Sequence, residues 1–428
     1  MVKQYEKYKT SKYTWFDNIP NNWQEARVSY YFEIGRGRVI AETELVEDGL
    51  YPVYSSQTKN NGCLGFINTY DFDDNILTWT TDGANAGSVF KRDGKFNCTN
   101  VCGTLKPKKD INLNYYLYFL QFVTQFYKRP DTNGAKIMNN EMAAIQLLVP
   151  TIQEQTQIAR YLDYKTGIID QLISKKQKLI ELLKEKRQAV INEAVTKGLN
   201  PKAKMKDSGI EWLGEIPEHW SVARIGHYSQ IIRGASPRPA GDPSLFGSEF
   251  MPWITVAEVT NGNDKFLYST SNYLTELGSK QSRIIYPETL LLSNSGATLG
   301  VPKISKITGC INDGSVAFIS FNKNLERDFL YYFFITHTET YRSEMAGYGQ
   351  PNLNTDIIKS TKIPLPPIEE QYQIINHIES TLNDFEILFS NTNLQIEKLK
   401  EYRQSIISEA VTGKIDVRDW EPNKQEVA

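Results

Sequence analysis

One helix-forming segment occurs twice in this chain of 428 residues. Residues 180–196 read IELLKEKRQAVINEAVT and residues 396–412 read IEKLKEYRQSIISEAVT, with identity at 12 of 17 positions. Chance does not produce such agreement. Because a period of about 200 residues is far too long for one unit of a solenoid, the repeat predicts two domains that are each followed by a helix.

The duplication also includes segments outside these helices. Each half has a variable middle between constant ends, and the middles contain short apolar runs such as NILTWTT and ETLLLS between Gly and Asn turns. This pattern is typical of strands, so each middle is expected to be a mixed α/β domain. The matching pairs are IPNNWQEARV (19–28) with IPEHWSVARI (216–225), GANAG (83–87) with GATLG (296–300), and YYLYFL from Tyr115 with YYFFIT from Tyr331.

Both tails have the pattern of a coiled coil. Apolar residues recur in two heptad rows in each tail, and polar residues interrupt the rows at matching places, Lys176 against Thr392 and Arg187 against Arg403. If each helix spans the gap between domains, the second must return the way the first went, which predicts an antiparallel pair. The alternative is two amphipathic helices that each lie on their own domain, although such lengths exceed typical globular helices. The residues expected to pair the helices are Leu162, Ile169, Ile173, Ile180, Leu183 and Val190 in the first helix and Ile378, Phe385, Phe389, Ile396, Leu399 and Ile406 in the second.

The composition excludes several classes of protein. No apolar run reaches the roughly 18 residues of a membrane span, and the first residues, MVKQYEKYKTSKYTWF, contain no apolar signal core. A cytoplasmic protein with no membrane partner is therefore expected. The formal net charge is only −2, so affinity for phosphate must come from local patches or from a partner. The four cysteines and four histidines show no ligand spacing, which predicts reduced thiols and no metal site.

Four motifs together carry a resemblance to a known family. Over essentially its whole length the chain resembles the specificity subunits of type I restriction-modification systems. Two of the four motifs are related: the one at residues 147–163 contains TIQEQ where the one at residues 363–375 contains PIEEQ. The motifs are LLVPTIQEQTQIARYLD (147–163), IDQLISKKQKLIELLKEKRQAVINEAVTKGL (169–199), MKDSGIEWLGEIPEHW (205–220) and IPLPPIEEQYQII (363–375).

The resemblance implies an α+β architecture, with two mixed α/β target-recognition domains separated by two long antiparallel helices that form a coiled coil. It also implies that each domain reads one half of a bipartite double-stranded DNA target and that the helices dock two adenine-N6 methyltransferase subunits. Those subunits would bind S-adenosylmethionine, so no cofactor is expected on this chain, and restriction or translocase subunits are possible further partners. The expected boundaries are 1–150 for the first recognition domain, 151–199 for the first helix, 200–363 for the second domain, 364–414 for the second helix and 415–428 for a C-terminal tail.

Motifs for catalysis are absent from the sequence. It contains no Asn-Pro-Pro-aromatic or Asp-Pro-Pro-aromatic tetrapeptide of a methyltransferase, no GxxxxGK[ST] loop of a translocase and no nucleophile elbow. A specificity subunit that is not itself an enzyme is therefore expected. Two other classes stay open at this point. One is a self-sufficient modification enzyme, which requires a cofactor site, and the other is a coiled-coil scaffold with two ligand-binding heads that does not bind DNA.

Loops in the two middles carry side chains that suit base readout. Arg pairs with guanine, and Asn or Gln pairs with adenine, where a loop reaches a groove. An ordinary turn is the alternative for each loop, and the GAxxG pair looks structural because domains that should read different bases share it. Tyr51, Tyr54 and Trp79 are expected to pack in the core or against the backbone rather than to flip a base. The DNA-contact candidates are Arg36, Arg38, Ser55, Gln57, Lys59, Asn60, Asn61, Thr80, Thr81, Asn85, Lys136, Arg233, Arg238, Asn294, Ser295, Gln350 and Asn352.

Overall fold

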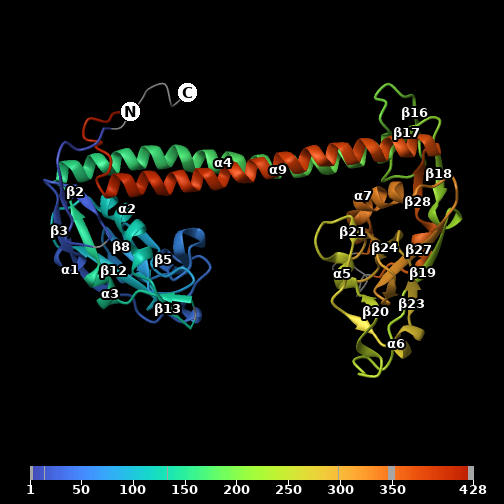
Figure 1. The fold of residues 1–428 in the computed structure, drawn as a ribbon, viewed down its shortest axis with the longest axis horizontal. Helices are drawn as coiled ribbons and strands as arrows, with labels where there is room; N and C mark the ends of the chain where they lie inside the picture. The colour runs from blue at the N-terminus through green and yellow to red at the C-terminus, as the bar shows by residue number, and fades with distance from the viewer. Residues whose placement is uncertain (1–2, 14, 133, 297, 346–351, 423–428) are drawn as a thin grey trace. The chain divides into compact units, whose positions relative to one another are not determined.

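The computed structural model describes residues 3–13, 15–132, 134–296, 298–345 and 352–422. The chain forms two compact units: unit 1 contains Met1–Lys178 and Thr392–Ala428, and unit 2 contains Leu179–Asn391. Two long helices, α4 (Ile152–Lys197) and α9 (Ile368–Val411), each begin in one unit and end in the other (Figure 1). Each unit therefore combines a globular body with one end of both helices.

Two four-stranded sheets form most of the body of unit 1. The first is antiparallel and holds, in spatial order, β10 (Val89–Arg92), β8 (Ile76–Thr80), β12 (Cys102–Pro107) and β4 (Phe32–Arg36). The second holds β6 (Cys63–Ile67), β5 (Tyr51–Tyr54), β11 (Lys95–Cys98) and β7 (Phe72–Asp73), with β5 and β11 parallel. The smaller sheets are β1 (Tyr8–Thr10) with β2 (Asn18–Pro20), β3 (Gln24–Arg27) with β15 (Gln146–Val149), and β13 (Arg129–Asp131) with β14 (Gly134–Lys136) and β9 (Asp82–Gly83). The short helices are α1 (Val28–Tyr31), α2 (Leu113–Val123) and α3 (Asn139–Ala144).

The body of unit 2 repeats this plan with additions. Its five-stranded sheet holds, in spatial order, β19 (Ser229–Arg233), β27 (Ser315–Phe321), β24 (Thr289–Ser293), β25 (Pro302–Ser305) and β21 (Phe266–Leu267). Its four-stranded sheet holds β22 (Tyr273–Leu274), β20 (Phe246–Ile254), β26 (Gly309–Ile311) and β23 (Arg283–Ile285). The smaller pairs are β16 (Met205–Asp207) with β17 (Glu215–Pro217) and β18 (Ser221–Arg224) with β28 (Lys362–Leu365). The short helices are α5 (Val256–Thr260), α6 (Glu276–Lys280) and α8 (Thr355–Ser360), and α7 (Arg327–Met345) is longer.

The central strand of each large sheet is buried along its whole length. Every residue of β8 and of β24 is buried, because α2 packs on the first strand and α5 on the second. A strand that is covered on both faces has a nearly continuous apolar run in place of the alternation of a half-exposed strand. The strands predicted from NILTWTT and ETLLLS are therefore confirmed.

Aromatic side chains fill the core of each unit and join the body to the long helices. In unit 1, Trp23, Trp79 and Phe119 are fully buried and belong to one cluster with Leu162 of α4 and Ile406 of α9. In unit 2 the equivalent cluster includes Trp220, Phe329 and Phe333 together with Val195 of α4 and Ile378 of α9. The body and the helix ends therefore share one hydrophobic core within each unit.

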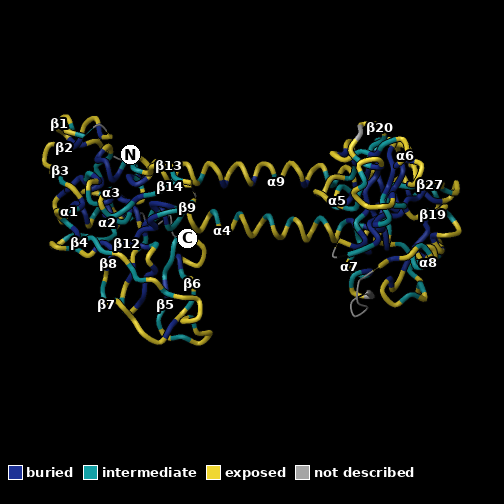
Figure 2. The backbone as a smooth tube through the Cα atoms, turned by 90° about the horizontal axis from the view of Figure 1, so that it is seen from below, coloured by how far each residue is buried: buried dark blue, intermediate teal, exposed yellow. Residues whose placement is uncertain are grey.

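The predicted heptad rows are the rows that the helices bury. Every expected helix-pairing residue is buried or half-buried, whereas most other positions of α4 and α9 are exposed (Figure 2). The helices run antiparallel in unit 1, since Arg403 bonds to Asp170 and Lys176 to Gln395. They do so in unit 2 as well, since Arg187 contacts Glu386 and the later Val195 clusters with the earlier Ile378. The architecture is α+β, as predicted. No helix within the described ranges is both long enough and apolar enough to cross a membrane.

Contacts extend the duplication and correct one of its pairings. Strands β1 and β2 pair in the same register as β16 and β17 at an offset of 197, so the repeated head begins at Tyr8 rather than Ile19. Tyr118 of α2 and Tyr332 of α7 both bond to an acidic residue on the long helix, Asp163 and Glu379 respectively. These tyrosines are 214 positions apart, so the expected pairing of YYLYFL with YYFFIT at 216 was wrong by two residues. Aromatic residues at four of the six positions in each segment made the two offsets look alike.

Candidate nucleic-acid interface

The GAxxG turns hold the ends of the two central strands in the same way. In unit 1 the hydroxyl of Thr80 accepts from the backbone N–H of Ser88 at 3.1 Å, and in unit 2 the hydroxyl of Ser293 accepts from that of Val301 at 2.8 Å. Both pairs of positions are related by an offset of 213. The first glycine of each turn has a φ of +85° or +76°, a conformation that favours glycine. The shared geometry supports a structural role for GAxxG.

Three of the DNA-contact candidates are buried. Thr80 and Thr81 are fully enclosed, and the Thr81 hydroxyl donates to the carbonyl of Val101 at 3.1 Å. Asn294 is equally buried, and its side-chain amide has no hydrogen-bond partner among the described residues. In this conformation these three side chains offer no group to a base. Gln350 lies outside the described residues.

Two basic candidates of unit 1 are engaged in ion pairs. Arg38 contacts Glu44 at 2.9 Å and Asp71 at 3.0 Å, and its hydrogen bond to Glu44 raises the pKa of the guanidinium. Lys136 lies 2.9 Å from Asp131, and its hydrogen bond to that carboxyl group lowers the pKa of Asp131. Both cations would have to exchange a protein carboxylate for a DNA phosphate.

Three polar candidates of unit 1 hold the loop that follows β5. The Ser55 hydroxyl accepts from Thr99 at 3.0 Å, and the Gln57 amide donates to the carbonyl of Cys63. The Asn85 amide lies 3.5 Å from the carbonyl of Ser56. Intramolecular bonds therefore occupy these side chains.

The loop at residues 59–62 brings three candidates together at the surface. Lys59, Asn60 and Asn61 are consecutive and exposed, and none of their side chains makes a hydrogen bond within the described part of the chain. Arg36 is also exposed, and its Nε donates to the carbonyl of Asn100 in a neighbouring turn. This loop is the largest group of unengaged candidates in unit 1.

In unit 2, two of the remaining candidates, Arg233 and Arg238, contact Asp313. Arg233 donates to the carbonyl of Asp313 at 3.0 Å, and Arg238 lies 3.6 Å from its carboxylate. Ser295 and Asn352 are joined by an antiparallel β-bridge, which places the two candidate segments side by side. The structure thus brings together Ser295 and Asn352 from two different loops, and it places Arg233 and Arg238 of a third loop against Asp313.

Sequence reasoning missed one buried cation in each unit. Arg92 of β10 and Lys303 of β25 are each 3% exposed, and burial lowers the pKa of both. Arg92 donates to the carbonyl of Asn61, and Lys303 donates to the carbonyl of Asn261. Both carbonyls belong to exposed loops. A basic residue in a short strand is normally read as facing solvent. Lys303 lies in a strand that is buried throughout, whereas β10 also contains the exposed Lys91, so the sequence offers a signal for Lys303 alone.

The three aromatic residues considered as base-flipping wedges have structural roles. Trp79 is fully buried, and its indole N–H donates to the carbonyl of Ile137 at 3.0 Å. Tyr54 is half-buried and covers the guanidinium of Arg92, while Tyr51 packs edge-on against Tyr70. Trp79 therefore has the predicted core position, while Tyr51 and Tyr54 are half-buried and pack on neighbouring side chains.

No group of His, Cys, Asp and Glu residues within the described ranges could hold a metal ion. The four cysteines carry no disulfide. Cys98 and Cys102 are neighbours in the core of unit 1, and the hydrogen bond between the two thiols raises the pKa of Cys98 far above its usual range.

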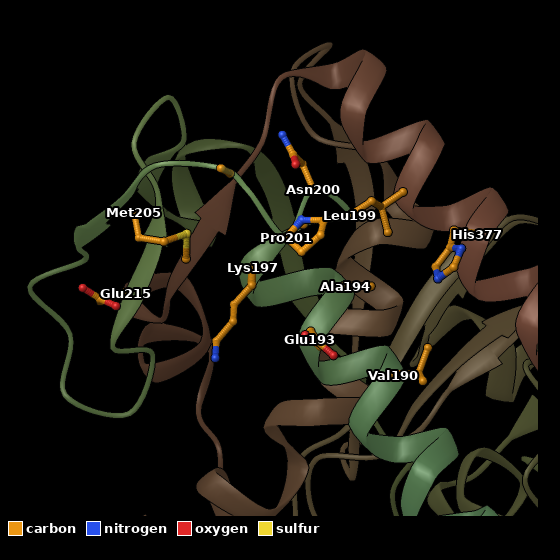
Figure 3. A pocket seen from close by; sticks show the side chains of 12 residues that line it. Val190, Glu193, Ala194, Lys197, Leu199, Asn200, Pro201, Met205, Glu215 and His377 are labelled. Carbon is orange, nitrogen blue, oxygen red and sulfur yellow. The ribbon is translucent and has the colours of Figure 1, made fainter.

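Unit 2 contains a hollow of about 580 Å³ beside the end of α4 (Figure 3). Its lining includes Val190 of α4 and His377 of α9, but none of the DNA-contact candidates. In unit 1 the counterpart of His377 at an offset of 216 is Tyr161, whose ring lies 5.1 Å from that of Trp420 in the C-terminal segment. We call this contact region of unit 1, where residues 415–420 pack on the helices, the tail site. The hollow lies at the equivalent end of α4, where residues that follow the helix, among them Leu199 and Pro201, line it.

A family model described as the type I restriction modification DNA specificity domain matches residues 20–182 and 217–398. The type I restriction enzyme MjaVIII specificity subunit of Methanocaldococcus jannaschii is 26% identical over 430 residues, which cover 94% of this chain and 95% of that relative. The putative MjaX specificity subunit of the same organism is also 26% identical, with coverage of 98% and 99%. The two matched ranges correspond to the two repeats.

Solved structures agree with the fold. A chain of a type I R-M system covers 93% of this chain and 99% of its own length, with a TM-score of 0.69 and 16% identity. The HsdS subunit from Thermoanaerobacter tengcongensis covers 93% and 98%, with a TM-score of 0.53 and 16% identity. At this level of identity the likeness shows a common fold.

Proposed function

Since this chain belongs to the family of type I restriction-modification specificity subunits, we propose that each of its two bodies reads one half of a bipartite sequence in double-stranded DNA. The observation that carries this proposal is a repeated frame around unlike loops. Trp23 donates to Glu154 at 3.3 Å in unit 1, and Trp220 donates to Glu370 at 3.0 Å in unit 2. A shared scaffold with different loops suits two recognition domains that have different base preferences.

The long helices are proposed to dock two adenine-N6 methyltransferase subunits. Large apolar side chains are exposed along both helices, among them Leu179 and Leu182 on α4 and Ile387 and Leu394 on α9. Exposed apolar side chains that gather on one element mark surfaces for protein partners. Buried against partner helices, these residues would stabilise the complex.

The chain itself is proposed to carry out no chemistry. S-adenosylmethionine would be bound by the methyltransferase subunits, which also hold the extruded adenine. Restriction and translocase subunits would join the same assembly. The protein would act in the cytoplasm, where it would meet these subunits and the DNA.

Exchange of one variable middle tests whether each domain reads its own half of the DNA target. Residues 221–362 would be replaced by the corresponding segment of a relative, and methylated adenines would be mapped across the genome of cells that contain the methyltransferase. We expect one half of the target to change while the other half stays the same. A change in both halves, or in neither, would contradict the proposal.

A further inference from the structure

The loop at residues 59–62 has an unusual backbone. Asn60 has φ 49° and ψ 40°, and Asn61 has φ 54° and ψ 33°, so two consecutive residues other than glycine adopt the left-handed conformation. Such strain persists only where the surrounding structure holds it, and it is concentrated at functional sites. Both side chains are exposed and unengaged in the described part of the chain, so the strain presents two amide groups to solvent.

The guanidinium of Arg92 is bonded to the backbone of this loop. Its Nη1 donates to the carbonyl of Asn61 at 2.8 Å, and its Nε donates to the hydroxyl of Thr78 at 3.2 Å. The guanidinium carbon lies 3.5 Å from the centre of the Tyr54 ring. No carboxylate in the described ranges forms an ion pair with it, although burying an unpaired cation is costly. Its hydrogen bond to the loop supplies a reason for its position.

Unit 2 contains a similar arrangement on β25, which lies between the buried strand β24 and the edge strand β21. Strand β25 pairs with the buried strand β24 as β10 pairs with β8. Lys303 of β25 donates to the carbonyl of Asn261, and Gly262 follows with a φ of +68°. Asn261 and Asn263 are exposed, and their side chains have no hydrogen bond within the described residues. A buried cation therefore fixes an Asn-bearing loop in both units, although the loop sequences differ.

We propose that the loops at residues 59–62 and 261–263 read adenine bases, one loop for each half of the DNA target, and that Arg92 and Lys303 are positioning residues. The proposal rests on the proposed function. An Asn amide matches the N6 donor and the N7 acceptor of adenine in the major groove. The neighbouring Lys59 supplies a contact to phosphate, which positions the loop without selecting a base. A loop that is rigid before binding loses less entropy on the DNA.

The base-reading residues are tested in the complete complex with the methyltransferase subunits. Binding would be measured by competition between the natural target and duplexes that each carry one substituted base pair. Asn60→Ala or Asn61→Ala is expected to lower discrimination at an A·T pair of one half-site by roughly 10- to 100-fold, the range of one bidentate base contact. Asn261→Ala or Asn263→Ala is expected to act on the other half-site only. Asn21→Ala, which changes an exposed asparagine outside both loops, is the control and should leave both half-sites unchanged.

The positioning role requires a different readout. Arg92→Met and Arg92→Lys should relax discrimination at the same base pair as Asn61→Ala, and should add little when combined with it. A merely structural role would instead weaken binding to all duplexes by the same factor and leave their ratios unchanged. The thermal unfolding midpoint of each variant would show that it is folded.

The outcomes separate this inference from the proposed function. If the four Asn variants keep full discrimination while exchange of residues 221–362 still changes one half-site, the inference is wrong and the proposed function stands. If the unmodified complex shows no sequence preference, the proposed function is wrong and the inference falls with it.

Discussion

Arg403 of α9 donates from Nε to Asp170 of α4 at 2.9 Å and from Nη2 to the second carboxylate oxygen at 3.3 Å. In unit 2, Arg187 of α4 contacts Glu386 of α9 at 3.2 Å. Both residues of the second pair are 216 positions from their counterparts in the first, with the roles of the two helices exchanged. The arginines that interrupt the predicted heptad rows are therefore paired across the helices, so each break contributes to the register.

Charge exchange tests this pairing. Arg403→Glu is expected to lower the stability of the helix pair in unit 1 by about 0.5–1 kcal/mol, because both side chains are partly exposed. The double variant Arg403→Glu, Asp170→Arg should recover most of the loss. Thermal unfolding at low and high salt is the measurement, and a deficit that high salt does not reduce would exclude an ionic origin.

The heptad rows make a second prediction with a matched control. Leu183 is half-buried in the row, while Leu182 beside it is 50% exposed. Leu183→Asp is expected to destabilise the isolated chain by about 1–2 kcal/mol, less than for a fully buried leucine, because only part of the side chain leaves water. Leu182→Asp should have little effect on the isolated chain. Equal losses in chemical denaturation would show that the row does not pair the helices.

His337 gives unit 2 a dependence on pH. It is 3% exposed among Trp212, Phe333 and Tyr341, and burial lowers its pKa to about 4 from an ordinary value of 6.5. The folded state therefore holds this ring neutral, while the unfolded state takes up a proton below pH 6.5. Stability is lost as pH falls from about 6.5 to about 4, by a total of about 3 kcal/mol. Unfolding between pH 4 and 7 should show a shallower loss for His337→Phe, and an unchanged slope would contradict the assignment.

The bonds between Trp and Glu at the start of each long helix predict two separate effects. Glu154→Ala leaves the buried indole N–H of Trp23 without its acceptor and should destabilise unit 1 by about 1–3 kcal/mol. Glu370→Ala should act in the same way on Trp220 in unit 2. Amide hydrogen exchange resolves the two units, and each variant should raise exchange in its own unit.

The purified chain is expected to leave DNA unmethylated when it is given S-adenosylmethionine alone. Addition of the methyltransferase subunits should produce methylation at one bipartite sequence. Liquid chromatography of digested DNA measures N6-methyladenine directly. Methylation by the purified chain without its partners would overturn the non-catalytic role proposed for it.

Periodic features of the fold could be predicted from sequence. The heptad rows and the apolar runs of β8 and β24 each repeat a simple spacing, so the elements and their buried faces were predicted from the residues alone. The repeated head at Tyr8 was missed because TSKYTWFDN and DSGIEWLGE share few letters, although both form the same strand pair. Its recognition required backbone pairing, which sequence identity does not report.

The candidate site was less predictable for a physical reason. Residue type indicates which side chains can contact a base, but it does not indicate which are already engaged within the protein. Arg38 and Gln57 look as suitable as Asn60 in the sequence, and the structure separates them by an ion pair and a backbone hydrogen bond. Arg92 was not considered because its partner, a loop carbonyl 31 positions away, is invisible in a linear pattern.

The tail site has a consequence for the surfaces that the two repeats present. When two copies of one sequence are joined in series, the end of the first copy becomes the connection to the second. Residues 198–204 make that connection here and lead from α4 to β16, whereas residues 415–420 follow α9 and place the Trp420 ring against Tyr161. One helix end is thereby closed and its counterpart remains hollow. Two helix ends with the same repeated sequence therefore present different surfaces, one covered by an aromatic contact and one open as a cavity.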